Sequence, residues 1–137
     1  LTPYAEQLTV SDSPFTLKLP NLWHLATDIA GTLASGSNSL DLVFALHPTA
    51  AVAGTPTVAA VEVIDDLEPF DRGRYAGPVG WIGADGDGEW AIALRCAQLT
   101  DSTVTAYAGC GIVSDSVPAN ELVETEMKFR PIVDALS

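Results

Sequence analysis

Positively charged side chains are scarce in this sequence of 137 residues. Six lysines and arginines stand against 18 aspartates and glutamates, which gives a formal net charge of −12. This balance argues against nucleic acid and an anionic membrane surface as partners. An anionic small molecule would have to be met by very few cations or by a bound metal ion. The six cations form no stripe; they are Lys18, Arg72, Arg74, Arg95, Lys128 and Arg130.

Long apolar runs are also missing. The best candidate for a membrane span is interrupted by His47, Pro48 and Gly54, well short of the roughly 20 residues that a span needs. The chain starts at Leu1 with a segment too polar for a signal peptide. We therefore expect a soluble, cytoplasmic protein, and an internal piece of a longer one. An apolar content of 47% predicts one compact unit with a sizeable core.

Cysteine occurs only twice, at Cys96 and Cys110, on what are predicted to be consecutive strands. A hairpin that turns near Asp101 and Ser102 would pair Cys96 with about residue 107 or 108, so the two thiols should not face each other. We expect two reduced thiols that pack as small hydrophobic groups, rather than a disulfide or a metal site.

The hydrophobic patterns predict an α+β fold in which helices pack on the outer face of an antiparallel sheet. Pro20-Asn21 should separate the first two strands, Ser39 should cap the first helix, and residues 49–56 should form a loop. The predicted strands span 15–19, 22–33, 74–84, 89–99 and 103–113, the last three as a meander. The predicted helices span 40–46, 56–67 and about 118–136.

Arg95 is the most informative cation. It is predicted in the middle of a strand, with Ala91, Ala93 and Ala97 on the same face. The small neighbours would leave room beside a guanidinium that suits a carboxylate. The alternative, an edge-strand arginine that reaches solvent or a structural partner, is equally compatible with the sequence.

Two glycines and a helical cluster form the second candidate group. Gly109 and Gly111 share one predicted strand face, where glycine marks either close approach of a ligand or a bulge. A three-residue turn would set Gly109 opposite Arg95. Glu121, Glu124 and Lys128 have spacings of three and four, which place them on one helix face.

The two glutamates of this cluster have two interpretations. Together with Lys128 they are plausible oxygen ligands for Mg²⁺. Each glutamate alone is more typical of an acidic residue that complements a helix dipole. Neither His24 nor His47 forms a recognisable catalytic pair, and no nucleophile elbow or phosphate-binding glycine loop occurs in the sequence.

Six segments, read together, resemble the C-terminal portion of the chorismate-utilising enzymes, among them isochorismate, salicylate, anthranilate and aminodeoxychorismate synthases. The resemblance covers nearly all of residues 1–137, as the C-terminal portion of one chorismate-binding domain whose N-terminal portion is absent. The segments are LWHLATDIAGTL (22–33), LHPTAAVAGTP (46–56), LEPFDRGRYAGPVGW (67–81), AIALRCA (91–97), AYAGCGIV (106–113) and ELVETEMK (121–128).

The resemblance implies roles for nine residues. Arg95 and Tyr75 would contact the pyruvyl end of chorismate, with backbone N–H groups at Gly109 and Gly111. Glu124 would bind Mg²⁺ with Glu121 beside it, and Lys128 would approach the substrate carboxylate. His24 would line the pocket for the ring of chorismate. Ala51 would indicate the branch of the family.

The stretch HPTAAVAG (47–54) is most similar to isochorismate synthases, whose usual motif is HPTPA; Ala50 here replaces the proline. Ala51 stands where salicylate and anthranilate synthases tend to carry threonine. The resemblance therefore implies an isomerase that interconverts chorismate and isochorismate with Mg²⁺, in a siderophore or menaquinone pathway.

The family's catalytic lysine and glutamate, and a further Mg²⁺-binding glutamate, match nothing in residues 1–137, so no catalytic residue is assigned and the fragment alone should be inactive. The alternatives are a salicylate or anthranilate synthase and a non-catalytic binding domain.

Overall fold

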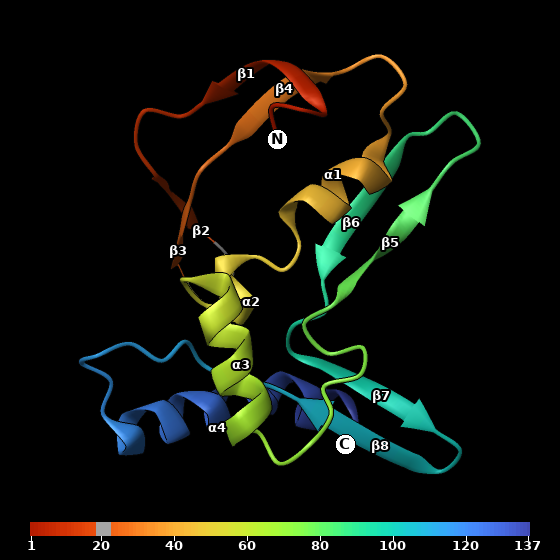
Figure 1. Cartoon of the computed structure of the whole chain (residues 1–137). Coiled ribbons are helices and arrows are strands. Elements are labelled where there is room, and N and C mark those ends of the chain that lie inside the picture. The colour runs from red at the N-terminus through yellow and green to blue at the C-terminus, as the bar shows by residue number, and fades with distance from the viewer. Residues whose placement is uncertain (19–22) are drawn as a thin grey trace. The chain divides into compact units, whose positions relative to one another are not determined.

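The computed structural model describes residues 1–18 and 23–137, and its contacts divide the chain into two units. Unit 1 comprises residues 1–46 and 82–88, and unit 2 comprises residues 47–81 and 89–137. The expectation of one compact unit is therefore wrong. The α+β class is confirmed, since helices alternate with short β-hairpins (Figure 1). The strands of the described residues form four two-stranded sheets rather than a continuous meander.

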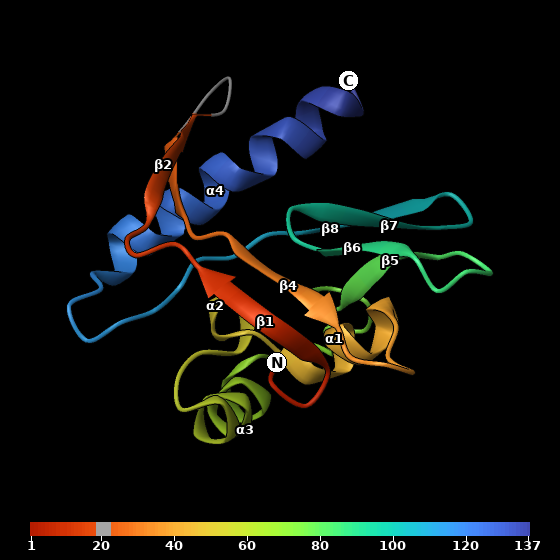
Figure 2. The same cartoon turned by 90° about the horizontal axis from the view of Figure 1, so that it is seen from above.

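Unit 1 contains a two-stranded ribbon. Strand β1 (Ala5–Val10) pairs antiparallel with β4 (Ile29–Leu33), and Figure 2 shows the two side by side. The sequence pattern missed β1. A bulge between Glu6 and Thr9, where Gln7 has a φ of 52°, shifts the register and obscures the alternation of polar and apolar residues.

The predicted strand 22–33 is two strands. Strand β3 (Trp23–Ala26) pairs with β2 (Phe15–Lys18), and β4 follows after a break at residues 27–28. Opposite the break, Pro14 has no N–H to donate to a ladder, so pairing is interrupted there. The predicted turn at Pro20-Asn21 lies outside the described residues.

Helix α1 (Ser39–Leu46) begins at Ser39, the predicted cap, and therefore one residue before its predicted start. The side chain of Asn38 accepts hydrogen bonds from the backbone N–H groups of Leu40 (2.8 Å) and Asp41 (3.4 Å). The Asp41 carboxylate accepts one in return from the Asn38 N–H at 2.8 Å. This reciprocal arrangement satisfies donors at the helix start. The helix ends before His47-Pro48, as predicted.

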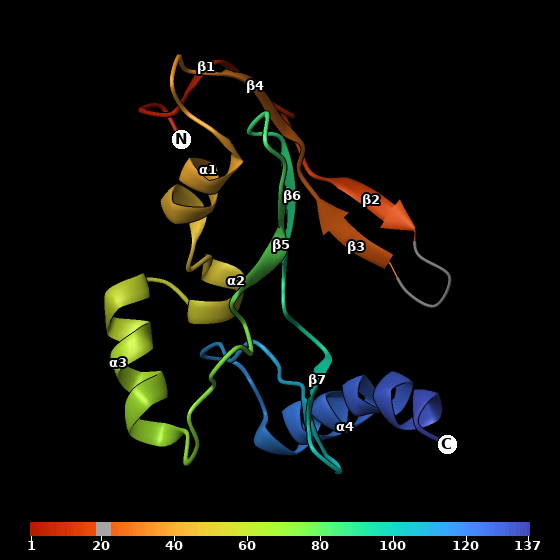
Figure 3. The ribbon, with the colours of Figure 1, turned by 90° about the vertical axis from the view of Figure 1, so that its right-hand side faces the viewer.

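The helices of unit 2 begin with a segment that was predicted as a loop. Residues Ala50–Ala53 form the short helix α2, because alanine strongly favours helix, and Gly54 ends it with a φ of 80°. Helix α3 (Thr57–Leu67) starts after Pro56, close to its predicted start. Figure 3 shows α2 and α3 running in different directions on either side of residues 54–56.

The strands between residues 74 and 113 are shorter than predicted. The hairpin β5–β6 spans Pro78–Ile82 and Gly88–Ile92, and the hairpin β7–β8 spans Cys96–Thr100 and Thr103–Tyr107. Cys96 pairs with Tyr107 around a two-residue turn, so the predicted register of this hairpin is confirmed. Cys96 and Cys110 are both free thiols. Helix α4 (Pro118–Ala135) matches its prediction and lies against β8.

Few side chains are buried. Among the described residues only Ala5, Ala53 and Ala76 are buried, whereas large apolar side chains are exposed, with Leu25 78% and Val58 75% accessible. The apolar faces of these hairpins and helices are therefore uncovered in this chain. No single described helix has the length and apolar composition of a membrane span; only the bent pair 39–53 and 57–67 meets those criteria, as a combination.

Gly80 on β5 provides a test of the β5–β6 hairpin. A Cβ added at this position would lie 2.1 Å from the Glu89 backbone oxygen and 2.8 Å from the Trp90 ring. Gly80→Ala should therefore destabilise the protein by about 1–3 kcal/mol, the usual cost of overpacking, measured as a lower Tm. Gly111→Ala is the matched control, because a Cβ there meets nothing within 4 Å. An equal Tm for both variants would contradict this hairpin geometry.

Candidate functional site

A cavity of about 310 Å³ lies within unit 2 and gathers six of the nine predicted site residues. Its volume is at the lower end of the range for small-molecule sites. The six predicted residues that line it are Ala51, Tyr75, Arg95, Gly109, Gly111 and Lys128. The other lining residues are Val52, Glu68, Phe70, Arg72, Ala76, Leu94, Ala108 and Cys110.

Arg95 lies outside the strands, so its predicted position in the middle of a strand is wrong. The chain leaves β6 after Ile92, the Leu94 N–H bonds the Ile92 carbonyl at 2.8 Å, and Arg95 adopts a φ of 48°. The predicted face shared with alanines is lost with the strand. Arg95 is exposed at the cavity, and across residues 1–18 and 23–137 its guanidinium makes no ion pair. It remains available to an anion.

Gly109 and Gly111 also lie outside their predicted strand, because β8 ends at Tyr107. The hairpin turn has two residues, not three, so the predicted pairing of Gly109 with Arg95 is wrong as well. A Cβ on Gly109 would come within 3.0 Å of the Tyr75 hydroxyl oxygen, whereas Gly111 faces open space. Both glycines leave backbone accessible along one wall of the cavity, since neither presents a side chain.

Lys128 joins helix α4 to this glycine segment. Its Nζ lies 2.6 Å from Glu124 Oε1 and donates a hydrogen bond of 2.9 Å to the Gly109 carbonyl. One turn away, the Thr125 hydroxyl donates to Cys110 Sγ at 3.4 Å. The predicted convergence of Glu124 and Lys128 on one helix face is confirmed. Part of the positive charge of Lys128 is already matched by Glu124.

The carboxylates of α4 offer a partial donor set for a metal ion. Glu124 is half-exposed at 49% of its side chain, and Glu121 lies one turn earlier. Within the described part of the chain, no group of three or more histidine, cysteine, aspartate or glutamate side chains is placed to hold a metal. Two carboxylates fit Mg²⁺, which takes one or two of them and keeps several waters.

Tyr75 forms an aromatic wall of the cavity. Its ring stacks on that of Tyr107 with centroids 5.3 Å apart and an interplanar angle of 15°. Burial raises the pKa of the Tyr75 phenol above its ordinary value of 10.0, although the charge of Arg72 acts in the opposite direction. The phenol therefore stays neutral near pH 7 and can donate a hydrogen bond into the cavity.

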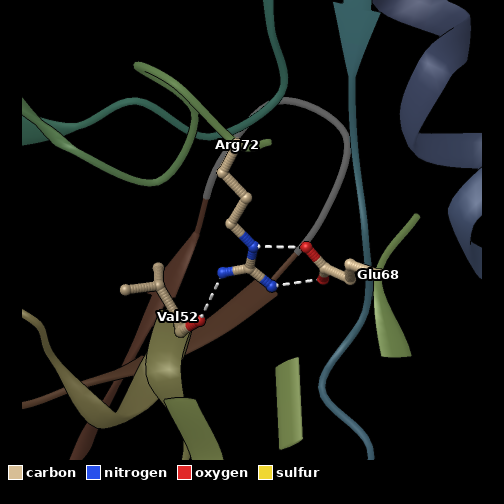
Figure 4. A network of polar contacts seen from close by, with 3 residues as sticks. All are labelled: Val52, Glu68 and Arg72. Atoms are coloured by element: carbon tan, nitrogen blue, oxygen red, sulfur yellow. Dashed lines mark hydrogen bonds and ion pairs between the residues drawn. The ribbon is translucent and has the colours of Figure 1, made fainter. Parts of the chain in front are cut away.

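The prediction missed Arg72 and Glu68, which also line this cavity. Figure 4 shows the Arg72 guanidinium between the Glu68 carboxylate and the Val52 carbonyl. The spacing of four residues was not a sufficient signal, because Glu68 and Arg72 lie beyond the end of α3 at Leu67, where this spacing does not place two side chains on one helix face.

Two further predicted site residues, His24 and Ala51, lie in different units. His24 is exposed on β3 in unit 1 and does not line the cavity of unit 2, so its role stays a prediction. Ala51 lies in the first turn of α2 and lines the cavity. With a cation, a phenol and open backbone around one cavity, the arrangement can bind a small anionic ligand.

Comparisons with known proteins agree with this geometry. The sequence profile of the family described as "Chorismate binding enzyme" matches residues 1–137. The isochorismate synthase DhbC of Bacillus subtilis is 45% identical over 137 residues, which are 99% of this chain and 34% of that protein. The isochorismate synthase EntC of Escherichia coli is 44% identical over 130 residues, 95% of this chain and 33% of that protein.

A solved structure gives the same result. The crystal structure of DhbC from Bacillus anthracis, provisionally described as a 2,3-dihydroxybenzoate-specific isochorismate synthase, superposes with a TM-score of 0.92 and 43% identity. The match covers 98% of this chain and 36% of that one, so the chain spans about a third of the length of its relatives. The chain therefore belongs to the chorismate-binding enzyme family, in which its relatives are isochorismate synthases.

Proposed function

We propose that this chain is the C-terminal part of an isochorismate synthase, in which it forms the part of the site that binds substrate carboxylate and metal. The observation that supports this most is the cavity of about 310 Å³ that gathers six of the nine residues implied by the resemblance. The named relatives are about three times longer, which agrees with a fragment.

Arg95 is the proposed anchor for a carboxylate of chorismate. A dianionic substrate that approaches a chain of net charge −12 needs local positive charge. Arg95 supplies it as an exposed guanidinium at the cavity, and a planar fork suits a carboxylate bidentately. Tyr75 and the open backbone at Gly111 add hydrogen-bond donors, and Lys128 adds the charge that Glu124 leaves unmatched.

Glu124 and Glu121 are the proposed ligands of Mg²⁺. The Lys128 ammonium lies 2.6 Å from Oε1 of Glu124, and the Glu124 side chain is half-exposed, so the carboxylate can also be reached by a metal. Bound there, Mg²⁺ would supply positive charge for the substrate carboxylate. The carboxylates of α4 would hold the ion, and Lys128 would hold Glu124 in place against the Gly109 carbonyl.

The acid–base groups of the proposed reaction lie elsewhere. The lysine that activates water and the glutamate that protonates the departing hydroxyl are implied by the resemblance for the part of the relatives that this chain does not span. Residues 1–137 would then be the part of the protein that binds and positions the substrate. The exposed apolar side chains of both units would be covered by that remaining part of the protein.

Arg95→Ala in the full-length protein tests the anchor. Because a hydrogen bond to a charged group contributes about 1.5–3 kcal/mol, the substitution should lower kcat/KM for chorismate by about 10-fold to 150-fold. Arg95→Lys should also impair it, since an ammonium cannot reproduce the fork. Arg74→Ala is the matched control, an exposed arginine that lines neither described cavity. Unchanged kcat/KM in Arg95→Ala would refute the anchor.

Glu124→Gln tests the metal ligand. The amide keeps the size of the side chain and removes its charge, so Mg²⁺ affinity should fall by at least the roughly 10- to 100-fold typical of a disturbed metal site. Calorimetric Mg²⁺ titration and Mg²⁺-dependent turnover should report the same loss while Tm stays unchanged. Glu126→Gln, exposed on the same helix, is the control. Wild-type affinity in the Glu124 variant would overturn the assignment.

Residues 1–137 produced alone should not turn over chorismate. Each proton-transfer group typically contributes about 10²- to 10⁴-fold, so loss of both leaves only positioning and electrostatics. The isolated chain should also aggregate or dimerise, and a separately supplied N-terminal segment should restore solubility and activity. Isochorismate formation by the purified 137-residue chain would show that the catalytic groups lie within it.

A further inference from the structure

Arg72 lies in a wall between two cavities. A second cavity of about 210 Å³ in unit 2 shares four lining residues with the first. The shared residues are Val52, Arg72, Tyr75 and Ala76. Any movement of this wall changes the shape of the candidate substrate cavity.

All three nitrogens of the Arg72 guanidinium are engaged in that wall (Figure 4). Nε and Nη2 donate to the two Glu68 carboxylate oxygens at 2.7 and 2.5 Å, and Nη1 donates to the Val52 carbonyl at 3.0 Å. The positive charge is therefore matched within the protein. A cation held in this way is a poor receptor for a substrate carboxylate, unlike the exposed Arg95.

Arg72 also contacts the aromatic wall. Its guanidinium lies over the Tyr75 ring, 5.6 Å from the centroid, and the Tyr75 N–H bonds the Arg72 carbonyl at 2.8 Å. One side chain thus fixes both the carbonyl next to Ala51 and the ring of Tyr75. These are two surfaces of the cavity that come from different elements, α2 and the loop 70–77.

We propose that Arg72, locked by Glu68, is a positioning residue that holds Tyr75 and the backbone at residues 51–52 in the shape that binds substrate. The substrate in this inference comes from the proposed function, whereas the contacts made by Arg72 do not depend on that function. Arg72→Lys keeps the charge and loses the fork. Glu68→Gln keeps the size and loses the charge that locks the fork.

Steady-state kinetics of the full-length protein with chorismate test the proposal. Arg72→Lys and Glu68→Gln should each raise KM by about 10-fold to 100-fold, the cost of misplacing a site by about 1 Å, with kcat much less affected. The double variant should be no worse than the worse single variant, because both act through one contact. Arg74→Lys and Glu62→Gln, exposed and lining neither cavity, are the matched controls.

The direction in which Glu68→Gln changes KM distinguishes between two roles of Arg72. A lower KM in this variant would show that Arg72 is a substrate-binding cation restrained by Glu68, and would overturn the proposal. Multiplied effects in the double variant, or unchanged KM in both single variants, would overturn it equally.

Amide hydrogen exchange tests the positioning role of Arg72 without any reaction. Both variants should exchange faster than wild type at residues 50–54 and 72–77, whereas the controls should not. Unchanged exchange there would refute positioning by Arg72 whatever the enzyme acts on. Failure of the wild-type protein to convert chorismate would refute the proposed function alone, and exchange would then decide this inference.

Discussion

Two reciprocal backbone hydrogen bonds hold the candidate site together. The Ala76 N–H bonds the Ala93 carbonyl and the Ala93 N–H bonds the Gly77 carbonyl, both at 2.9 Å. They join the loop of residues 70–77, which carries Arg72 and Tyr75, to the segment after β6, which carries Arg95. Ala76 is 6% exposed and has a φ of 64°, and Arg95 has a φ of 48°, so two left-handed residues turn the chain at this junction. The loop leads into β5 and Arg95 follows β6, so these bonds extend the pairing of β5 with β6 to both walls of the cavity.

The ends of secondary-structure elements, more than their middles, build the cavity. Arg95 follows the end of β6, Gly109 and Gly111 follow the end of β8, and Glu68 follows the end of α3. This explains which part of the site was predictable from sequence. The register of β7–β8 was predicted, because a two-residue turn determines it, whereas the roles of the site residues were implied by the family resemblance. The end of β6 and the left-handed conformation of Arg95 were not predicted. The alternation typical of a strand continues through Arg95, and only tertiary hydrogen bonds impose the turn.

The same reasoning explains the other errors. Strand β1 carries a bulge at Glu6–Thr9 that hides its alternation of polar and apolar residues. Residues 50–53 were predicted as a loop because proline and glycine flank them, but their alanines form one turn of helix. The ion pair of Arg72 with Glu68 depends on a loop that returns toward α2, which sequence spacing alone does not fix. Few of the described side chains are buried, and the chain spans about a third of the length of its relatives.

A crystal structure of the full-length protein with chorismate and Mg²⁺ is the most direct test that this chain forms the carboxylate side of the site. The account predicts a substrate carboxylate within hydrogen-bonding distance of the Arg95 guanidinium, with the Tyr75 ring beside it and Arg72 still paired with Glu68. A substrate carboxylate bound to Arg72, or a substrate bound away from the cavity of unit 2, would contradict it.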